Sequence, residues 1–164
     1  MTHHLSVRII GSSEGAADNQ FSQPRSICLN PRTREVFVVD SNNHRVQIFD
    51  LRSLAYIRTI GEKHHHTFAF AAGFGNGLSD PVLNSPVSCC LDNAGHLYVS
   101  DTNSHRIVVF DQKTGEVVRT ISRQGSLTGF VNKPYGICID SKTGYLYVAD
   151  YHNHRVQVFD SETC

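Results

Sequence analysis

Short runs of apolar residues alternate with polar, turn-forming stretches along most of the chain. In a run such as 45–49, RVQIF, branched and aromatic side chains alternate with polar ones. This composition and its period of two favour β-strands, and no segment has a convincing helical period. The sequence therefore predicts an all-β protein built from short strands. The expected strands are 26–29, 36–39, 45–49, 55–60, 88–91, 97–99, 117–121, 136–139 and 146–149.

Three segments of the chain align with one another, at residues 24–50, 86–111 and 134–160. In each, an Asp is followed four residues later by His-Arg and nine residues later by Phe. A further apolar run follows the first two copies, which gives four short strands in each. Four antiparallel strands in a repeat of about 45 to 50 residues are typical of one β-propeller blade. The sequence thus predicts a single partial propeller domain over residues 1–164, with blades at about 21–61, 82–122 and 130–164.

The third repeat stops before its fourth strand, and a matching strand lies at the other end of the chain. Residues 5–11, LSVRIIG, resemble the two fourth strands, with Arg8 in the position of Arg58 and Arg119. This segment is therefore expected to complete the last blade. Closed propellers contain about four to eight blades, so three blades predict either half of a six-bladed propeller or a fragment. In the first case two copies of the chain form a homodimer that closes the ring.

The turn between the second and third strands carries the most specific motif. The sequence NHRVQIF at 43–49 recurs as NHRVQVF at 153–159 and as SHRIVVF at 104–110. This motif resembles the NHL repeat, although Ser104 replaces its first Asn. The resemblance implies a propeller, often six-bladed. It implies no single activity, because NHL propellers occur in tripartite-motif ubiquitin ligases, RNA-binding translational regulators, sensor kinases and a zinc-dependent amidating lyase.

The repeated polar residues of this motif are expected to be structural. Equivalent positions in successive blades are spread around an axis, whereas the ligands of one metal ion must converge. In each blade we expect the Asp to accept hydrogen bonds from the neighbouring Arg or His, since charge-assisted bonds are strong. The motif residues are Asp40, Asn43, His44, Asp101, His105, Asp150, Asn153 and His154.

Composition and charge narrow the classes of partner. The 164-residue chain has 15 basic and 15 acidic side chains, so no overall charge attracts nucleic acid or anionic lipid. No apolar run reaches the roughly 18 to 20 residues of a membrane helix, and no membrane contact is expected. The five cysteines include no CxxC pair, and Cys28, Cys90 and Cys138 occupy equivalent first-strand positions. We interpret them as reduced packing residues, which predicts a cytoplasmic protein without a cofactor.

In four-stranded blades, the connectors between blades and the turns between second and third strands share one face. Loops on a rigid scaffold commonly carry function. The sequence therefore predicts a binding rim there, with Arg45, Arg106, Tyr151, His152 and Arg155 as candidate contacts. A second hypothesis is a metal site of rim histidines, although no carboxylate or cysteine at fixed spacing supports it. Its candidate ligands are His64, His65, His66 and His152.

The sequence contains no recognisable catalytic motif. It lacks a GxSxG elbow, an HExxH helix and a phosphate-binding glycine loop. We therefore predict a non-catalytic propeller scaffold that mediates protein–protein interaction. The resemblance extends this to substrate recognition in a ubiquitin-ligase-type pathway. An RNA-binding propeller surface is the alternative, and a metal-dependent lyase or hydrolase that uses rim histidines is the second alternative.

Overall fold

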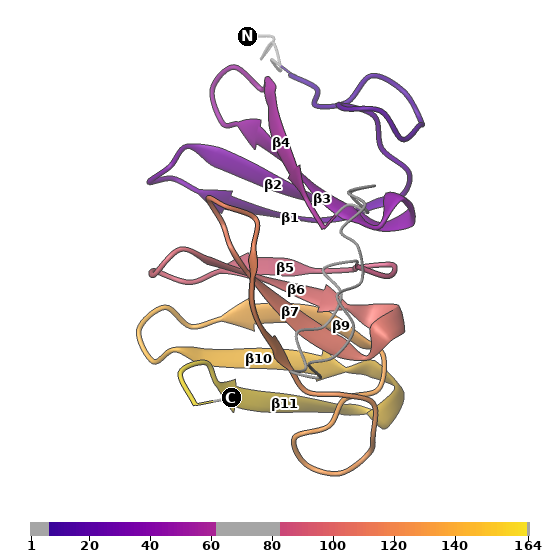
Figure 1. Ribbon diagram of the computed structural model, residues 1–164, viewed down its shortest axis with the longest axis vertical. Helices are drawn as coiled ribbons and strands as arrows, with labels where there is room; N and C mark the ends of the chain where they lie inside the picture. The colour runs from indigo at the N-terminus through magenta and orange to yellow at the C-terminus, as the bar shows by residue number, and fades with distance from the viewer. Residues whose placement is uncertain (1–6, 62–82, 164) are drawn as a thin grey trace, which may run out of the picture.

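The computed structural model describes residues 7–61 and 83–163, which form three antiparallel sheets stacked face to face (Figure 1). The first blade contains β1 (Pro24–Asn30), β2 (Glu35–Asp40), β3 (Arg45–Asp50) and β4 (Tyr56–Ile60). The second contains β5 (Cys89–Leu91), β6 (His96–Asp101), β7 (Arg106–Asp111) and β8 (Val117–Ile121). The third contains β9 (Pro134–Ile139), β10 (Tyr145–Asp150) and β11 (Arg155–Asp160). The all-β prediction, with propeller-type blades, is confirmed.

Each strand pairs with its neighbour along the chain, so every blade is a simple meander. The registers are equivalent, because the motif Asp ends the second strand and faces the Arg that begins the third. A single turn of 3-10 helix joins these two strands in every blade. These turns are η1 (Ser41–Asn43), η2 (Thr102–Ser104) and η3 (Tyr151–Asn153). The repeated sequence therefore produces the same backbone three times.

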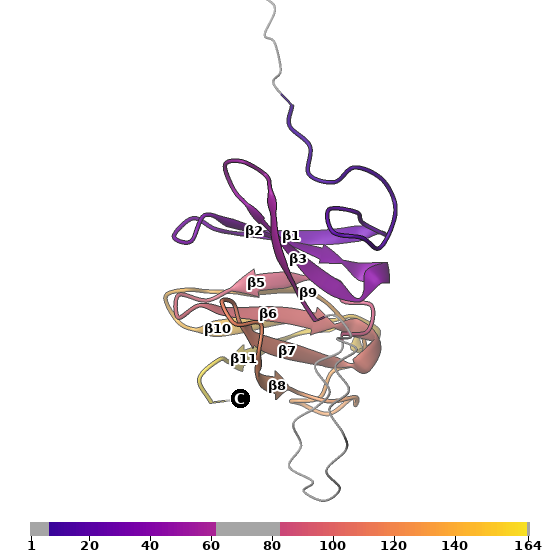
Figure 2. The same cartoon turned by 45° about the horizontal axis from the view of Figure 1, so that its top comes forward.

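The hydrophobic core lies between the blades and follows from the alternation of side chains along each strand. We call the face that a blade turns toward the following blade its trailing face, and the opposite one its leading face. The trailing face of the first blade packs on the leading face of the second (Figure 2). The second and third blades meet in the same way. The buried residues of the first contact are Phe37, Val39, Val46, Ile48, Ile60, Leu83, Cys89, Leu97, Val99, Val108 and Phe110.

The connectors before the first and third blades pack against the blades. Phe21 lies on the leading face of the first blade, where its ring centroid is 5.7 Å from that of Phe49. Val131, in the equivalent connector of the third blade, is fully buried against the second blade's trailing face. Both of these connectors also form an isolated bridge, between Glu14 and Phe21 and between Gln124 and Val131. The connectors are thus part of the packed structure.

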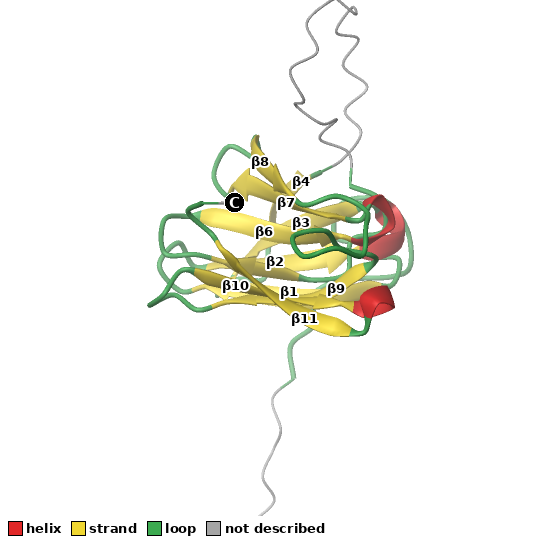
Figure 3. Cartoon of the chain, turned by 90° about the horizontal axis from the view of Figure 1, so that it is seen from below, coloured by secondary structure: helices red, strands yellow, loops and turns green. Residues whose placement is uncertain are grey.

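The 3-10 turns and the connectors lie at the same end of the sheets. The backbone N–H of Asn42 donates to the carbonyl of Ser22 at 3.1 Å, and that of His152 to the carbonyl of Asn132 at 3.0 Å. The helical turns, drawn in red, gather on one side of the molecule in Figure 3. This common end is the rim that the repeat pattern predicts.

The third blade contains three strands among the described residues, and residues 7–10 form no strand. The N-terminal segment drawn in indigo, which begins at residue 7, lies beside the first blade, at the opposite end of the stack from β11 (Figure 1). Within one chain, the segment therefore cannot pair with the third blade. In the part of the chain that the structure describes, no helix is long and apolar enough to cross a membrane.

Candidate functional site

A buried aspartate organises the turn between the second and third strands. Asp40 is fully buried, and its carboxylate accepts hydrogen bonds from the backbone N–H of Ser22 at 2.7 Å and from Asn43 Nδ2 at 2.9 Å. Nε of Arg45 forms an ion pair with Oδ2 at 2.8 Å, and Gln47 Nε2 donates at 3.2 Å. These contacts hold the connector, the turn and the third strand together. The burial of this carboxylate is offset by a full set of donors.

The connector N–H and the motif Arg recur as partners of the Asp in the other blades, whereas Ser104 and Val108 replace the Asn and Gln donors in the second blade. Asp101 and Asp150 are fully buried. Each accepts a hydrogen bond from a connector N–H and forms an ion pair with the motif Arg. Asp150 also accepts bonds from Asn153 and Gln157. Burial raises the pKa of Asp150, but these donors outweigh it and hold the pKa below its usual range. In all three blades the Asp is thus the acceptor and the motif Arg is one of its donors.

Two of the motif arginines, Arg45 and Arg155, fasten the connectors instead of lining an open surface. The guanidinium of Arg45 donates to the carbonyls of Ala17 and Gln20, and only 2% of this residue is exposed. Side-chain exposure rises to 16% for Arg106 and 29% for Arg155. Even the more exposed Arg155 donates to three connector carbonyls and to Asp150. Arg45, Arg106 and Arg155, which the sequence predicted as contacts on the rim, are therefore bonded within the blades.

The motif histidines have a role that the sequence reasoning missed. His44 and His105 cap their turns in the left-handed conformation, with φ of 57° and 53°. Their rings do not donate to the Asp; Nδ1 of His44 accepts a hydrogen bond from Ser85 N–H at 2.9 Å, and Nδ1 of His105 accepts one from Lys133 N–H at 3.1 Å. Each bond joins one blade to the connector of the next. Only the repeated stacking of blades could have revealed this role.

The remaining rim candidates form an exposed aromatic patch. The rings of Tyr135 and Tyr151 stack with centroids 4.4 Å apart and planes within 8° of parallel. The ring centroid of His152 is 5.3 Å from that of Tyr151, and the ammonium of Lys133, two residues before Tyr135, donates to Asn103. Tyr151 is 55% exposed in spite of the stacking. We call Lys133, Tyr135, Tyr151 and His152 the aromatic patch. The sequence indicated Tyr151 and His152, whereas Tyr135 and Lys133 carry no signal apart from their place next to Pro134.

The metal hypothesis receives no supporting geometry. His64, His65 and His66 lie outside the described residues. Among the residues that are described, no group of three His, Cys, Asp or Glu side chains is placed to hold a metal ion. His152 lies next to the ring of Tyr151 and near His105. Burial, followed by the charges of Lys133 and His152, lowers the pKa of His105.

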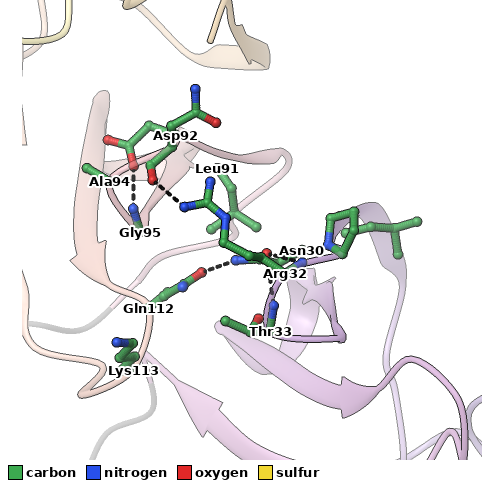
Figure 4. A pocket seen from close by; sticks show the side chains of 12 residues that line it. Asn30, Arg32, Thr33, Leu91, Asp92, Ala94, Gly95, Gln112 and Lys113 are labelled. Carbon is green, nitrogen blue, oxygen red and sulfur yellow. Dashed lines mark hydrogen bonds between the residues drawn. The ribbon is translucent and has the colours of Figure 1, made fainter.

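A cleft of about 640 Å³ opens at the other end of the first two blades, between their first-to-second turns (Figure 4). Arg32 reaches across it and donates to the carbonyl of Asn93 at 3.2 Å, while Asn30 Nδ2 donates to Gln112 Oε1 at 2.8 Å. The carboxylate of Asp92 accepts bonds from its own turn, including Gly95 N–H at 2.8 Å. The lining contains neither Cys nor His. The polar groups of this cleft tie the blades together, and they include no nucleophile beside a base.

The comparison with known families decides the identity of the repeat. A family model described as NHL repeat matches residues 21–49, 83–110 and 131–159, which together make up more than half of the chain. The chain belongs to the NHL repeat family. The matched segments contain every motif Asp, His and Arg described above, and the resemblance drawn from the motif is confirmed.

Several proteins that are similar to this chain are longer. NHL repeat-containing protein 2 of Gallus gallus is 31% identical over 67% of this chain, which covers 15% of that relative. Protein brain tumor of Drosophila melanogaster is 25% identical over 78% of this chain and 10% of its own length. Hydrazine synthase of Kuenenia stuttgartiensis shares the fold, with a TM-score of 0.63 and 16% identity over 90% of this chain and 35% of its own. The NHL chain described here thus spans about 15% or less of these curated relatives.

Proposed function

We propose that this chain is a non-catalytic NHL scaffold that binds a protein partner through the aromatic patch at the rim. The observation that carries the proposal is the parallel stack of Tyr135 and Tyr151, which leaves 55% of Tyr151 exposed. NHL propellers are known for protein–protein interaction and are generally scaffolds. The polar groups that line the 640 Å³ cleft include no nucleophile beside a base.

The patch has the physical properties of an interface anchor. Tyrosine combines a large apolar ring with a polar tip, and such residues often dominate binding energy. Here Tyr151 is held by η3 and Tyr135 by β9, so little side-chain entropy remains to be lost on binding. The ammonium of Lys133 and the imidazole of His152 supply polar contacts at the edge. A partner with an exposed apolar or aromatic side chain next to an acidic group fits this arrangement.

The setting of this interaction is a further part of the proposal. We infer that the scaffold serves as a recognition module, of the kind that selects substrates in a ubiquitin-ligase-type pathway. The free thiols of Cys28, Cys89, Cys90 and Cys138 suit the reducing cytoplasm that we assign to it. A metal-dependent lyase or hydrolase, the second alternative, would need His64, His65 and His66. These three residues lie outside the part of the chain that the structure describes.

RNA is the second candidate ligand, and the stacked tyrosines favour it. Bases stack on exposed aromatic rings, with cationic side chains holding the phosphates. The motif arginines, however, are committed to buried aspartates, and the chain carries no net positive charge. The protein hypothesis therefore takes precedence, and a single-stranded RNA serves as one arm of its test.

The test starts from a displayed library of random peptides selected against the unsubstituted chain. Selected peptides are titrated calorimetrically against Tyr151→Ala and against the control Tyr145→Ala, which removes a tyrosine of similar exposure, 44%, from β10. Loss of an anchor worth about 2 kcal/mol weakens binding about 30-fold. We expect that loss for Tyr151→Ala only. Equal affinities for both variants contradict the proposal, and salt-sensitive binding of a uridine dodecamer without any selected peptide replaces it by the RNA function.

A further inference from the structure

The trailing face of the third blade is exposed, although its sequence matches faces that are buried elsewhere. Tyr147, Val156 and Val158 are 39%, 66% and 53% exposed. Their counterparts in the first blade, by register, have no exposed area, and those in the second have at most 1%. These counterparts are Phe37, Val46 and Ile48 in the first blade, and Tyr98, Ile107 and Val109 in the second. The third blade therefore presents a face with the composition of an interior.

The third blade also presents two sets of polar groups that are paired in the other blades, namely the edge of β11 and the ring of His154. Strand β11 is an edge, whereas β3 and β7 each pair with a fourth strand on that side. The ring of His154 has no recorded hydrogen bond among the described residues, while His44 and His105 each accept one from the next connector. An exposed strand edge readily pairs with another chain. The trailing end of the molecule thus has an open edge, an open face and a spare ring acceptor.

The leading face of the first blade offers the matching half of each contact. Ile27 and Leu29 are 66% and 51% exposed, yet the counterpart of Ile27 in the third blade, Ile137, is 8% exposed against the second blade. Gln23 has φ of 52°, in line with 49° at Ser85 and 54° at Lys133. Ser85 and Lys133 are the residues whose N–H groups donate to a motif histidine. The backbone at Gln23 is therefore shaped to present its N–H to one.

Residues 7–10 already approach the position of a fourth strand that precedes the first blade. The guanidinium of Arg58 reaches the carbonyl of Gln112, and that of Arg119 reaches the carbonyl of Ser161, each in the turn after the next blade's third strand. Arg8 makes the equivalent contact, donating to the carbonyls of Arg52 at 2.6 Å and Ser53 at 3.1 Å.

The apolar residue two positions later repeats this pattern. Ile10 packs on the apolar cluster of the first blade, as Ile60 and Ile121 pack on those between blades. The backbone polar groups of residues 7–10, however, have no strand beside them within the chain.

We propose that the trailing face of the third blade binds residues 7–10 and the leading face of the first blade of a second copy of this chain. In this contact, residues 7–10 of the second copy pair with β11 in the way that β4 pairs with β3. Val156 then lies opposite Ile10 of the second copy, and Val158 lies opposite its Arg8. Nδ1 of His154 accepts a hydrogen bond from the N–H of the second copy's Gln23. The third blade thereby gains its fourth strand.

A second copy is the occupant because every unfilled group at one end has its counterpart at the other end of the same chain. A head-to-tail contact of this kind forms a closed ring when the rotation closes. Two copies supply six blades, within the usual range of about four to eight, whereas one copy supplies three. This inference bears on the aromatic patch, because the counterparts of Tyr151 in the other blades, Ser41 and Thr102, are buried, and Thr102 donates to the carbonyl of Pro134 in the following blade. The ring would therefore bring the second copy against Tyr151.

The test is the mass of the 164-residue chain by sedimentation equilibrium. We expect twice 18.3 kDa. The variant Val156→Asp places a carboxylate at the centre of the contact and should raise the dimer dissociation constant at least about 100-fold. Its control is Val118→Asp, at a residue 45% exposed on β8 whose counterpart Ile57 is 43% exposed, so this position stays exposed in the ring. Circular dichroism verifies that both variants keep their strands.

A complementation experiment locates the two halves of the contact. Ile10→Asp and Val156→Asp each damage both junctions of the ring, but their mixture retains one undamaged junction. We expect a heterodimer in the mixture and monomers in the separate samples. A folded monomer of the unsubstituted chain overturns the proposal, as does a dimer that Val156→Asp leaves intact. Masses that grow with concentration beyond the dimer overturn the closed ring.

Discussion

Nδ1 of His105 accepts a hydrogen bond from the backbone N–H of Lys133 at 3.1 Å, and this bond joins the second blade to the connector of the third. The bond requires an unprotonated Nδ1. Burial, followed by the charge of Lys133 and that of His152, lowers the pKa of His105 from its usual value. A histidine whose pKa is lowered by folding stabilises the fold fully above its unfolded pKa, and this contribution is lost as the pH falls through the folded value.

Acidification should therefore loosen the second and third blades. We expect the free energy of unfolding to fall as the pH drops below about 6.5, the usual histidine pKa. His105→Gln keeps an acceptor at this position without a titrating ring, so its stability should depend less on pH in this range. Urea unfolding at a series of pH values measures both proteins. Parallel profiles would show that His105 makes no such contribution.

Asp150 is predicted to be essential for the stability of the third blade. Asp150→Ala removes the buried acceptor that Asn132 N–H, Asn153, Arg155 and Gln157 share, which should cost about 2 to 4 kcal/mol in free energy of unfolding. Because folding lowers the pKa of Asp150, its contribution is present above about pH 4 and is lost as the pH falls through the lowered value. The matched control is Asp18→Ala, which removes an exposed carboxylate. Similar melting temperatures for the two variants would refute this role.

Gly61 allows the chain to leave the first blade beside Leu83. Its φ is 87°, and an added Cβ would lie 2.6 Å from Leu83 Cδ1. Gly129 has φ of 86° but nothing within 4 Å of such a Cβ. Gly129→Ala should therefore lower the free energy of unfolding through backbone strain alone. Gly61→Ala should lower it by about 1 to 3 kcal/mol more, because the new methyl group overpacks against Leu83. Thermal unfolding of both variants measures the difference. Equal losses would mean that Leu83 moves aside without cost.

The thiols of the first strands report on the packing between blades. Hydrogen bonding to Cys89 and burial raise the pKa of Cys28, and burial raises that of Cys90. In a Cys164→Ser background, the variant Val156→Asp should react with a maleimide first at Cys138, which is exposed. In the chain that keeps Val156, closure of the six-bladed ring should protect Cys138 from the maleimide, in addition to the buried thiols. Peptide mass spectrometry gives the rate at each site, and rapid modification of Cys138 in both proteins would contradict this expectation.

The sequence predicted the blades because their features are local. The alternation in 45–49 sets which side chains face inward, and the recurrence of Asp, His-Arg and Phe sets the turn three times. The Asp–Arg pairs form within one hairpin, so their role could be read from spacing. The site was less predictable. Arg45 looked available for a partner, but its guanidinium ends on connector carbonyls that precede it by more than 20 residues.

The sequence by itself determined an all-β NHL repeat chain built of propeller blades, with a hydrogen-bonding Asp in each turn between second and third strands. Periodicity and repetition encode these properties at short range. Only the tertiary structure decided that the motif histidines join blades, that Tyr135 stacks on Tyr151, and that Val156 stays exposed while Val46 is buried. The physical reason is that these outcomes depend on which blade faces which. The hairpins of all three blades have the same local pattern, and their neighbours distinguish them.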